Sequence, residues 1–169
     1  MRWVLLGLLV GLPAVASDLE YETATYGGVF DACYTAAETR EDRQACVGQM
    51  SEACMEGEEG GYSTLGMSSC TRAETIMWDG ALNAEYKSTM AAMKAADKDE
   101  AEYFPGYAKR VESLRDVQRA WIPFRDASCS FAYALWGSGS MRNTEYAGCM
   151  LEMTSQRTIE LIDIKGFYQ

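Results

Sequence analysis

Apolar side chains recur every three or four residues along three long segments of the chain, which is the spacing of one buried helix face. The first segment predicts a helix over residues 68–96, with the stripe Trp78, Leu82, Tyr86, Met90 and Met93. A second, mainly apolar series at helical spacing runs along Tyr107, Val111, Leu114, Gln118, Trp121, Ile122 and Arg125, and a third along Tyr146, Met150, Met153, Arg157, Leu161 and Ile164. No segment of any length alternates like a β-strand, so the pattern predicts an all-α bundle of antiparallel helical hairpins.

Shorter features separate these helices. Residues 29–38 and 41–56 predict two short helices, rich in Ala, Cys and Glu. The glycine-rich residues 57–66 predict a flexible, exposed loop. The charged run at 97–100, followed by Phe104-Pro105-Gly106, predicts a polar connection between the first two long helices.

The first 16 residues have the order of a secretory signal peptide. Arg2 is followed by an apolar run and then by Pro13 and Ala14-Val15-Ala16, a small-residue cleavage motif. The apolar run is shorter than the roughly 20 residues that cross a bilayer, which argues against a membrane anchor. We therefore expect a signal peptide at 1–16 and one periplasmic or secreted domain at 17–169. Residues 17–26 show no period and are expected to be a mobile start.

Charge and composition narrow the functional classes. The chain has 25 acidic and 15 basic residues, a net charge of −10, and removing the leader with its single arginine gives −11. This charge argues against nucleic acid or an anionic membrane as a partner and is compatible with a cationic protein. The chain has no histidine, which excludes Ser-His and Cys-His catalytic pairs and every His–metal site. We therefore expect no enzyme activity, no cofactor and no metal.

All six cysteines lie after the leader, in the part of the chain expected in an oxidising compartment. In an antiparallel hairpin, residues equidistant from the turn face each other at the short Cα–Cα distance that a disulfide needs. This symmetry favours the pairs Cys33–Cys46, Cys54–Cys70 and Cys129–Cys149. A Cys₄ metal site is the alternative, although no Cys-x-x-Cys occurs, and connectivity among the first four cysteines stays open.

Three groups of residues carry a resemblance to a known family. They are Leu82-Asn83 with Tyr86, the run Gln118-Arg119-Ala120-Trp121 with Phe124-Arg125-Asp126-Ala127 and Cys129, and Cys149 with Thr154 and Arg157. Together they resemble the LprI-like lysozyme-inhibitor family over residues 70–164. The resemblance implies a small, helical, disulfide-bonded, exported domain, and some members of the family inhibit lysozyme. The sequence departs from the pattern in lacking a lipid-acceptor cysteine and in having Pro123 within the signature helix, where it predicts a kink.

The motif residues have two interpretations. The first is a buried or half-buried polar network that ties helices together, and the second is a partner-binding surface. The residues concerned are Asn83, Tyr86, Gln118, Trp121, Arg125, Asp126, Thr154 and Arg157. We expect the first interpretation to hold, and we expect the three tryptophans after the leader, Trp78, Trp121 and Trp136, to lie in the core.

Two functions from different classes follow. The first is a protein-binding module that inhibits a cationic, lysozyme-like cell-wall hydrolase, and the second is a structural or envelope-stress protein with no enzyme target. For the first, two glycine-rich loops closed by cysteine pairs are candidate contacts, residues 57–66 and residues 137–143. The loop at 57–66 is preferred, because Glu58, Glu59 and Tyr62 offer negative charge and an aromatic ring to a basic enzyme. An ordinary solvated turn is the alternative for this loop.

Overall fold

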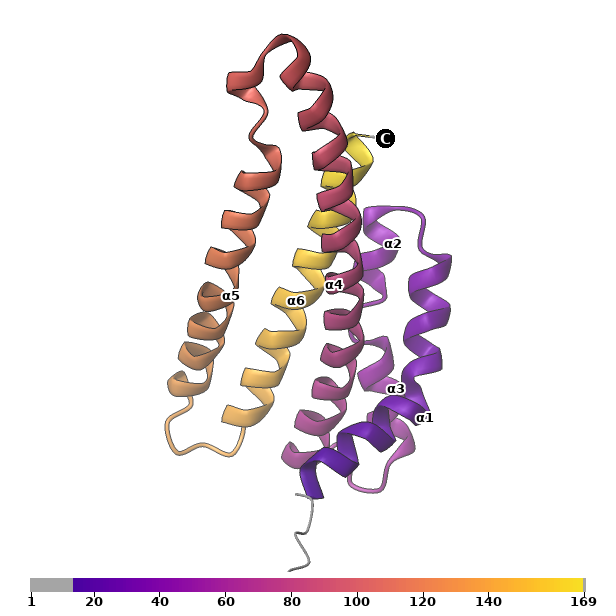
Figure 1. Ribbon diagram of the computed structural model, residues 1–169. Coiled ribbons are helices and arrows are strands. Elements are labelled where there is room, and N and C mark those ends of the chain that lie inside the picture. The colour runs from indigo at the N-terminus through magenta and orange to yellow at the C-terminus, as the bar shows by residue number, and fades with distance from the viewer. Residues whose placement is uncertain (1–13, 169) are drawn as a thin grey trace, which may run out of the picture.

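The computed structural model describes residues 14–168 (Figure 1). In chain order the elements are α1 (Ala14–Ala36), α2 (Arg40–Ala45), α3 (Gln49–Gly57), α4 (Thr64–Tyr103), the short 3-10 helix η1 (Pro105–Tyr107), α5 (Arg110–Leu135) and α6 (Arg142–Phe167). No strand occurs among residues 14–168. The prediction of an all-α bundle is confirmed.

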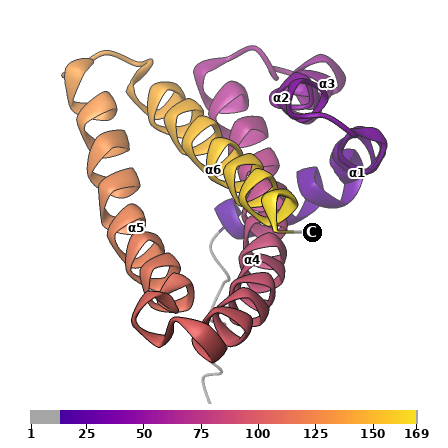
Figure 2. The ribbon, with the colours of Figure 1, turned by 90° about the horizontal axis from the view of Figure 1, so that it is seen from above.

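Helices α4 and α6 run side by side through the middle of the molecule (Figure 1). The view from above shows α5 on one side of this pair and α1 to α3 on the other (Figure 2). With 40 residues, α4 is about 60 Å long and reaches from the α3–α4 loop at one end of the molecule to the α4–α5 turn at the other. The two ends of α4 therefore present separate surfaces.

The first core cluster joins α1, α3, α4 and α6 around Trp78. The Trp78 side chain is fully buried, and Phe30 and Tyr34 of α1 contact its ring edge-on at centroid distances of 5.1 and 5.6 Å. Such edge-to-face contacts add to the stabilisation that burial of a large aromatic side chain provides. Met50 from α3 and Ile159 from α6 complete the cluster and fix α1 and α3 against the central helix pair.

A second, smaller cluster lies between α4, α5 and α6. Its buried members are Leu82, Met93, Leu114 and Leu161, and Trp121 packs against it while staying partly exposed. The hydroxyl of Thr89 donates to the Leu161 carbonyl at 3.0 Å inside this interface, so the buried hydroxyl has a partner. Of the three tryptophans expected in the core, Trp136 is instead 45% exposed, because it follows the last residue of α5.

Three disulfides tie the hairpins together. They are Cys33–Cys46, Cys54–Cys70 and Cys129–Cys149, with Cα–Cα distances of 5.7, 5.6 and 5.4 Å. No cysteine among the described residues is free, so the alternative of a Cys₄ metal site is wrong. The pairs join the end of α1 to the end of α2, α3 to α4, and α5 to α6.

The expectation of a mobile start at residues 17–26 is wrong, because these residues belong to α1. Long-range contacts hold this part of the helix: Ser69 donates to the buried Glu22 at 2.8 Å, and Tyr26 donates to Glu58 at 2.9 Å. The signal peptide proposed for residues 1–16 lies outside the described residues except for its last three positions, which begin α1. None of the described helices is both long enough and apolar enough to cross a membrane.

Two further boundaries differ from the predictions. The single helix expected over 41–56 is divided into α2 and α3, because Gly48 adopts a left-handed conformation (φ 93°) that interrupts it. The helix expected over 68–96 begins earlier, where the Ser63 hydroxyl accepts from the Gly66 N–H at 3.1 Å, and it continues to Tyr103. The charged run at 97–100 is therefore helical and not a connection.

Asp97 explains why this charged run belongs to the fold. Its carboxylate accepts from the backbone N–H groups of Arg110 and Val111 at 3.0 and 2.9 Å, and from the Arg110 guanidinium at 3.2 Å. Asp97 thereby caps the start of α5 from the neighbouring helix. Burial alone would raise the pKa of Asp97, but these donors outweigh burial and lower it.

Helix α5 continues past Pro123 without interruption. The proline side chain is exposed, so its ring faces solvent instead of a packed neighbour. The missing N–H costs one hydrogen bond of the helix, while the apolar contacts of Leu114 and the disulfide at Cys129 hold the helix on either side of this position.

Candidate functional site

A groove of about 480 Å³ lies between α4 and α5, in the size range of small-ligand sites. Most of the residues of the family-like signature that lie on these two helices line it. Helix α4 contributes Asp79, Leu82, Asn83 and Tyr86, and α5 contributes Arg115, Gln118, Arg119, Trp121, Ile122 and Arg125. The groove therefore brings together Asn83, Tyr86, Gln118, Trp121 and Arg125 from two segments that are distant in the sequence.

Arg125 is held in place at one side of the groove by three neighbours. Its guanidinium lies over the Trp121 ring, 4.9 Å from the centroid, and donates to the carboxylate of Asp126 at 3.0 Å from Nε. The carboxylate of Asp79 lies 4.0 Å from Nη1 across the groove. Because the Arg125 side chain is only 14% exposed, this cation–π contact is partly shielded from water, which strengthens it.

Gln118 connects the groove to α6. Its carbonyl oxygen accepts from Nε of Arg157 at 2.9 Å, and both side chains are buried. Nη1 of Arg157 donates to Glu160 at 2.7 Å, so the buried charge has a carboxylate partner. Two buried polar atoms have no hydrogen-bond partner among the described residues, Nη2 of Arg157 and Oγ1 of Thr154.

The motif residues thus divide between the two interpretations. Gln118, Thr154 and Arg157 are buried, as a helix-tying network requires. Tyr86, Trp121 and Arg125 are half-buried, and they line the groove. Asn83 is exposed and donates to Asp79 of its own helix at 3.0 Å, and the Asp126 side chain is 50% exposed.

Sequence reasoning missed Arg115 as a groove residue, and it placed Arg119 in the signature run without assigning it to a site. Both are exposed, and neither forms an ion pair with any residue in the part of the chain that the structure describes. Guanidinium groups bind carboxylates and phosphates through charge-assisted hydrogen bonds, so this groove suits an anionic group although the chain as a whole has a net charge of −10. The available signal was their spacing of four residues on the same helix face as Gln118 and Ile122.

The loop between α3 and α4 is the second candidate, and it is firmly held. The Cys54–Cys70 disulfide closes it, and the Tyr62 hydroxyl donates to Glu52 at 2.8 Å while Tyr26 donates to Glu58. The hydrogen bond to the Glu52 carboxylate raises the pKa of Tyr62. Glu59 is exposed, the Tyr62 ring is 57% exposed, and Glu58 is half-buried.

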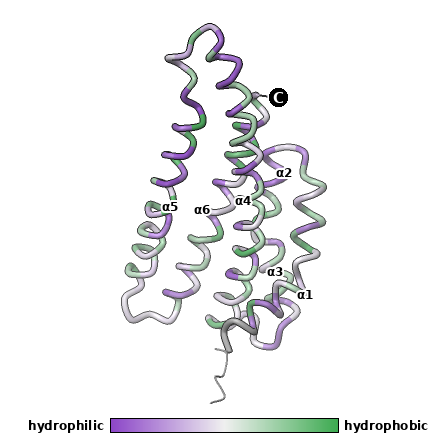
Figure 3. Tube along the Cα trace, viewed as in Figure 1, coloured by the Kyte–Doolittle hydropathy of each residue, from purple (hydrophilic) through white to green (hydrophobic). Residues whose placement is uncertain are grey.

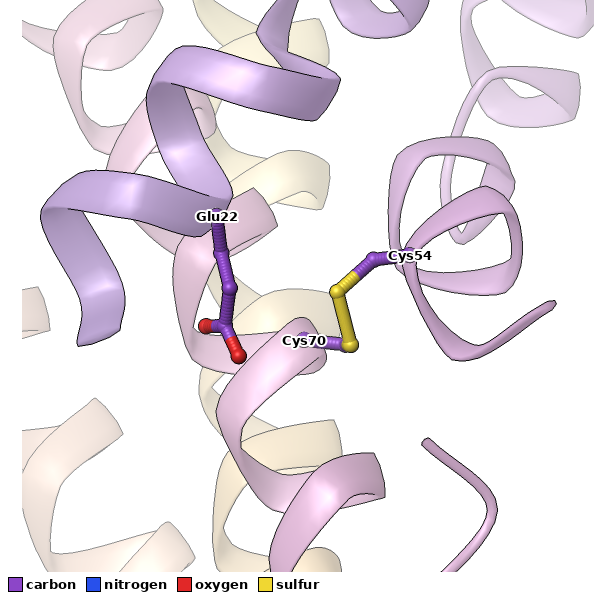
Figure 4. A group of neighbouring side chains, drawn as sticks. All are labelled: Glu22, Cys54 and Cys70. Atoms are coloured by element: carbon purple, nitrogen blue, oxygen red, sulfur yellow. A yellow bond between two sulfur atoms is a disulfide. The ribbon is translucent and has the colours of Figure 1, made fainter. Parts of the chain in front are cut away.

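Glu22 lies beside the same disulfide, and the ligand atoms of Glu22, Cys54 and Cys70 are within 4.8 Å of one another (Figure 4). Both sulfur atoms are bonded to each other, so neither is a thiolate that could bind a metal. Burial raises the pKa of the Glu22 carboxyl, although the hydrogen bond from Ser69 opposes this effect. The cluster is therefore a buried carboxyl group packed against a disulfide.

Comparison with known proteins identifies the family. The model of the family described as lysozyme inhibitor LprI matches residues 54–161 of the chain, which contain the groove, the α3–α4 loop and two of the three disulfides. The chain belongs to the lysozyme inhibitor LprI family. The resemblance inferred from the signature residues is thereby confirmed.

Two relatives extend the LprI match. An uncharacterized protein of Rhizobium meliloti (strain 1021) is 35% identical over 102 residues, which cover 60% of this chain and 73% of that protein. An uncharacterized 17.7 kDa protein of Rhodobacter capsulatus, from the puhA 5′ region, is 30% identical over 168 residues, which cover 95% of this chain and 96% of that protein. No solved structure matches the chain.

Proposed function

We propose that this protein is an exported inhibitor of a cationic, lysozyme-type cell-wall hydrolase. The observation that carries the proposal is the LprI family match over residues 54–161. Three disulfides support export, because disulfides persist in oxidising compartments. The net charge of −10 supports a basic partner, because complementary charge speeds association and selects the partner.

We propose the α3–α4 loop as the surface that contacts the enzyme. No lysine or arginine occurs between Arg43 and Arg72, whereas this interval contains Glu52, Glu56, Glu58 and Glu59. The loop is short and closed by a disulfide, so binding costs little conformational entropy. Tyr62 supplies the exposed aromatic ring that interface anchors commonly use.

Titration against a cationic lysozyme that is degrading bacterial cell walls tests the function. We expect turnover to fall to its minimum at about one equivalent of inhibitor at low ionic strength, and the inhibition to weaken as salt is added. An unchanged rate at a large excess would refute the proposal and favour the alternative, a structural or envelope-stress protein with no enzyme target.

A matched pair of triple variants tests the contact surface. Replacing Glu58→Gln, Glu59→Gln and Tyr62→Ala should raise the inhibition constant about tenfold or more. The control replaces Asp99→Asn, Glu102→Gln and Tyr103→Ala, which are two exposed acids and an exposed tyrosine near the other end of α4. Equal inhibition by both triple variants would show that the contact lies elsewhere while leaving the inhibitory function intact.

A further inference from the structure

The outer face of α5 carries an apolar stripe that no element among residues 14–168 covers. Its positions alternate by three and four residues, which is the heptad spacing of a helix that packs against another helix. The stripe consists of Val117, Ala120, Phe124, Ala127, Phe131 and Ala134, and all six are exposed. Val117, Phe124 and Phe131 are 51, 64 and 65% exposed, and their spacing places all three on one helix face as a contiguous apolar strip.

Helix α5 is much less covered than its neighbour of equal length. Both α5 and α6 have 26 residues, but α5 has three buried residues and α6 has eight. Figure 2 shows why, because α5 stands at the edge of the molecule while α6 lies between α4 and α5. In Figure 3 the half of α5 that leads into the α5–α6 turn is coloured mostly white to green, so few strongly hydrophilic residues lie on this half of the helix.

The stripe is also uncharged within a strongly acidic chain. None of its six positions is charged, and residues 114–136 contain three arginines and two aspartates, a net charge of +1 against −10 for the whole chain. An apolar, nearly neutral strip of this length does not attract a cationic enzyme electrostatically. It is suited to packing against another helix that also presents an uncharged, apolar face.

We propose that the stripe is the interface of a homodimer, in which α5 of one copy packs antiparallel against α5 of a second copy. Antiparallel pairing about a two-fold axis midway between Phe124 and Ala127 places Val117 opposite Ala134, Phe131 opposite Ala120, and Phe124 opposite Ala127 of the other copy. Each large side chain meets an alanine in every layer. This alternation lets the helices approach closely and interdigitate.

Charge placement selects the same orientation. Among the positions that flank the stripe on the helix surface in this heptad spacing, Asp116 is the one charged residue, one position before Val117. In an antiparallel pair the two Asp116 carboxylates lie at opposite ends of the interface, whereas a parallel pair would set them side by side and place Phe124 against Phe124. The pairing is isologous, so it closes with two copies.

The dimer leaves the candidate functional surfaces open. On a helix with 3.6 residues per turn, Gln118 and Arg125 of the groove face away from Phe124 and Phe131. The α3–α4 loop belongs to the opposite side of the molecule from α5 (Figure 1). Self-association therefore does not compete with the proposed contact to a lysozyme.

Sedimentation equilibrium of the protein as exported tests the proposal, over about 1 to 300 μM and at several salt concentrations. We expect a monomer–dimer equilibrium that shifts toward the dimer as salt rises, because salt screens the repulsion between two acidic chains. Inhibition of a cationic lysozyme should change with salt in the opposite direction. The two proposals can therefore fail independently.

Variants of the stripe make the test specific. Phe124→Glu should weaken dimerisation at least about 30-fold, because it places a charge in the centre of an apolar interface. Leu65→Glu is the matched control, since Leu65 is 80% exposed on α4 and away from the stripe. Both replaced side chains are exposed, so both variants should keep the circular dichroism spectrum and melting temperature of the parent.

A second replacement tests the orientation. In the antiparallel dimer, adding Ala127→Lys to Phe124→Glu sets each introduced carboxylate opposite an introduced ammonium group of the other copy and should recover most of the lost affinity. In a parallel dimer the same double variant would set like charges together and would not recover it. A monomer at every concentration, a dimer unaffected by Phe124→Glu, or loss of lysozyme inhibition in that variant without any parental dimer would each overturn the proposal.

Discussion

Replacement of Glu74 by leucine should destabilise the protein more than replacement of any exposed acid. The Glu74 side chain is fully buried, and its carboxylate accepts three hydrogen bonds. Oε1 accepts from the Gly48 N–H at 2.7 Å and from Nε1 of Trp78 at 3.1 Å, and Oε2 accepts from the Ser51 N–H at 2.8 Å. The carboxylate thus closes the N-terminus of α3, where backbone donors lack partners and negative charge is favourable.

The magnitude follows from the donors left behind. A leucine side chain has a volume similar to that of glutamate but no hydrogen-bond acceptor. Each buried donor that loses its partner costs about 1–3 kcal/mol. Removing the buried carboxylate also removes the cost of taking its charge out of water, which offsets part of this destabilisation. We expect Glu74→Leu to lower the free energy of unfolding by about 4 kcal/mol. Glu74→Gln keeps one acceptor oxygen but turns an NH₂ group toward a donor, so about 2 kcal/mol is expected.

Urea unfolding followed by circular dichroism measures both values, because the shift in midpoint at constant slope gives the change in stability. Asp99→Leu is the control, since Asp99 is an exposed acid on the same helix and should change stability by no more than about 0.5 kcal/mol. If Glu74→Leu differs from the parent by less than about 1 kcal/mol, the reasoning from unsatisfied donors is refuted.

Three further changes test other contacts. Asp97→Ala should lower the free energy of unfolding by about 1 kcal/mol at neutral pH, as loss of a helix cap does. Folding lowers the pKa of Asp97, so its stabilising contribution is fully present at pH values above the ordinary pKa of 3.8. In urea titrations the difference between variant and parent should vanish as the pH falls through the folded-state pKa. Glu22→Gln should raise the melting temperature at pH 7 and have little effect below pH 4.5, because burial raises the pKa of Glu22, so ionisation costs stability only above that range. Replacing Cys129 and Cys149 by serine should cost about 3 kcal/mol in the chain-entropy account, measured against the oxidised parent.

The hairpins were predictable because the sequence marks them twice. A glycine-rich stretch between two helical stripes indicates a turn, and cysteines equidistant from it indicate which residues face each other, as at Cys129 and Cys149 around Gly139. The helix class followed from apolar spacing alone, since Trp78 and Leu82 both point into cores where α4 meets other helices. Apolar spacing, glycine-rich turns and cysteine spacing depend only on residues close together in the chain, so they can be recognised in the sequence before the fold is known.

The features that failed depend on contacts between distant segments. Residues 17–26 have no apolar period, and they are helical because Glu22 and Tyr26 bind Ser69 and Glu58. Asp97 looks like a loop residue in the sequence, yet it caps α5 from the end of α4. Before the chain folds, nothing distinguishes such residues from ordinary surface acids.

The groove was predictable only in part for the same reason. Gln118, Trp121 and Arg125 were singled out as candidate residues, whereas the exposed Arg115 and Arg119 were not, because they resemble the surface arginines of any helix. Only the approach of α4 brings them beside Asn83 and Tyr86 and so forms the groove. A site formed between two helices is a property of their packing.

Charged and apolar residues are distributed so that three surfaces of the molecule differ in the kind of contact they favour. All charged residues between Arg43 and Arg72 are glutamates, the groove between α4 and α5 carries arginines, and the outer stripe of α5 is apolar. Salt weakens binding between opposite charges, whereas it strengthens apolar association of two chains with the same charge. A measurement that varies only salt therefore separates a contact of either charged surface from self-association through the apolar stripe, and the α3–α4 loop and α5 lie on opposite sides of α4 and α6 (Figure 1).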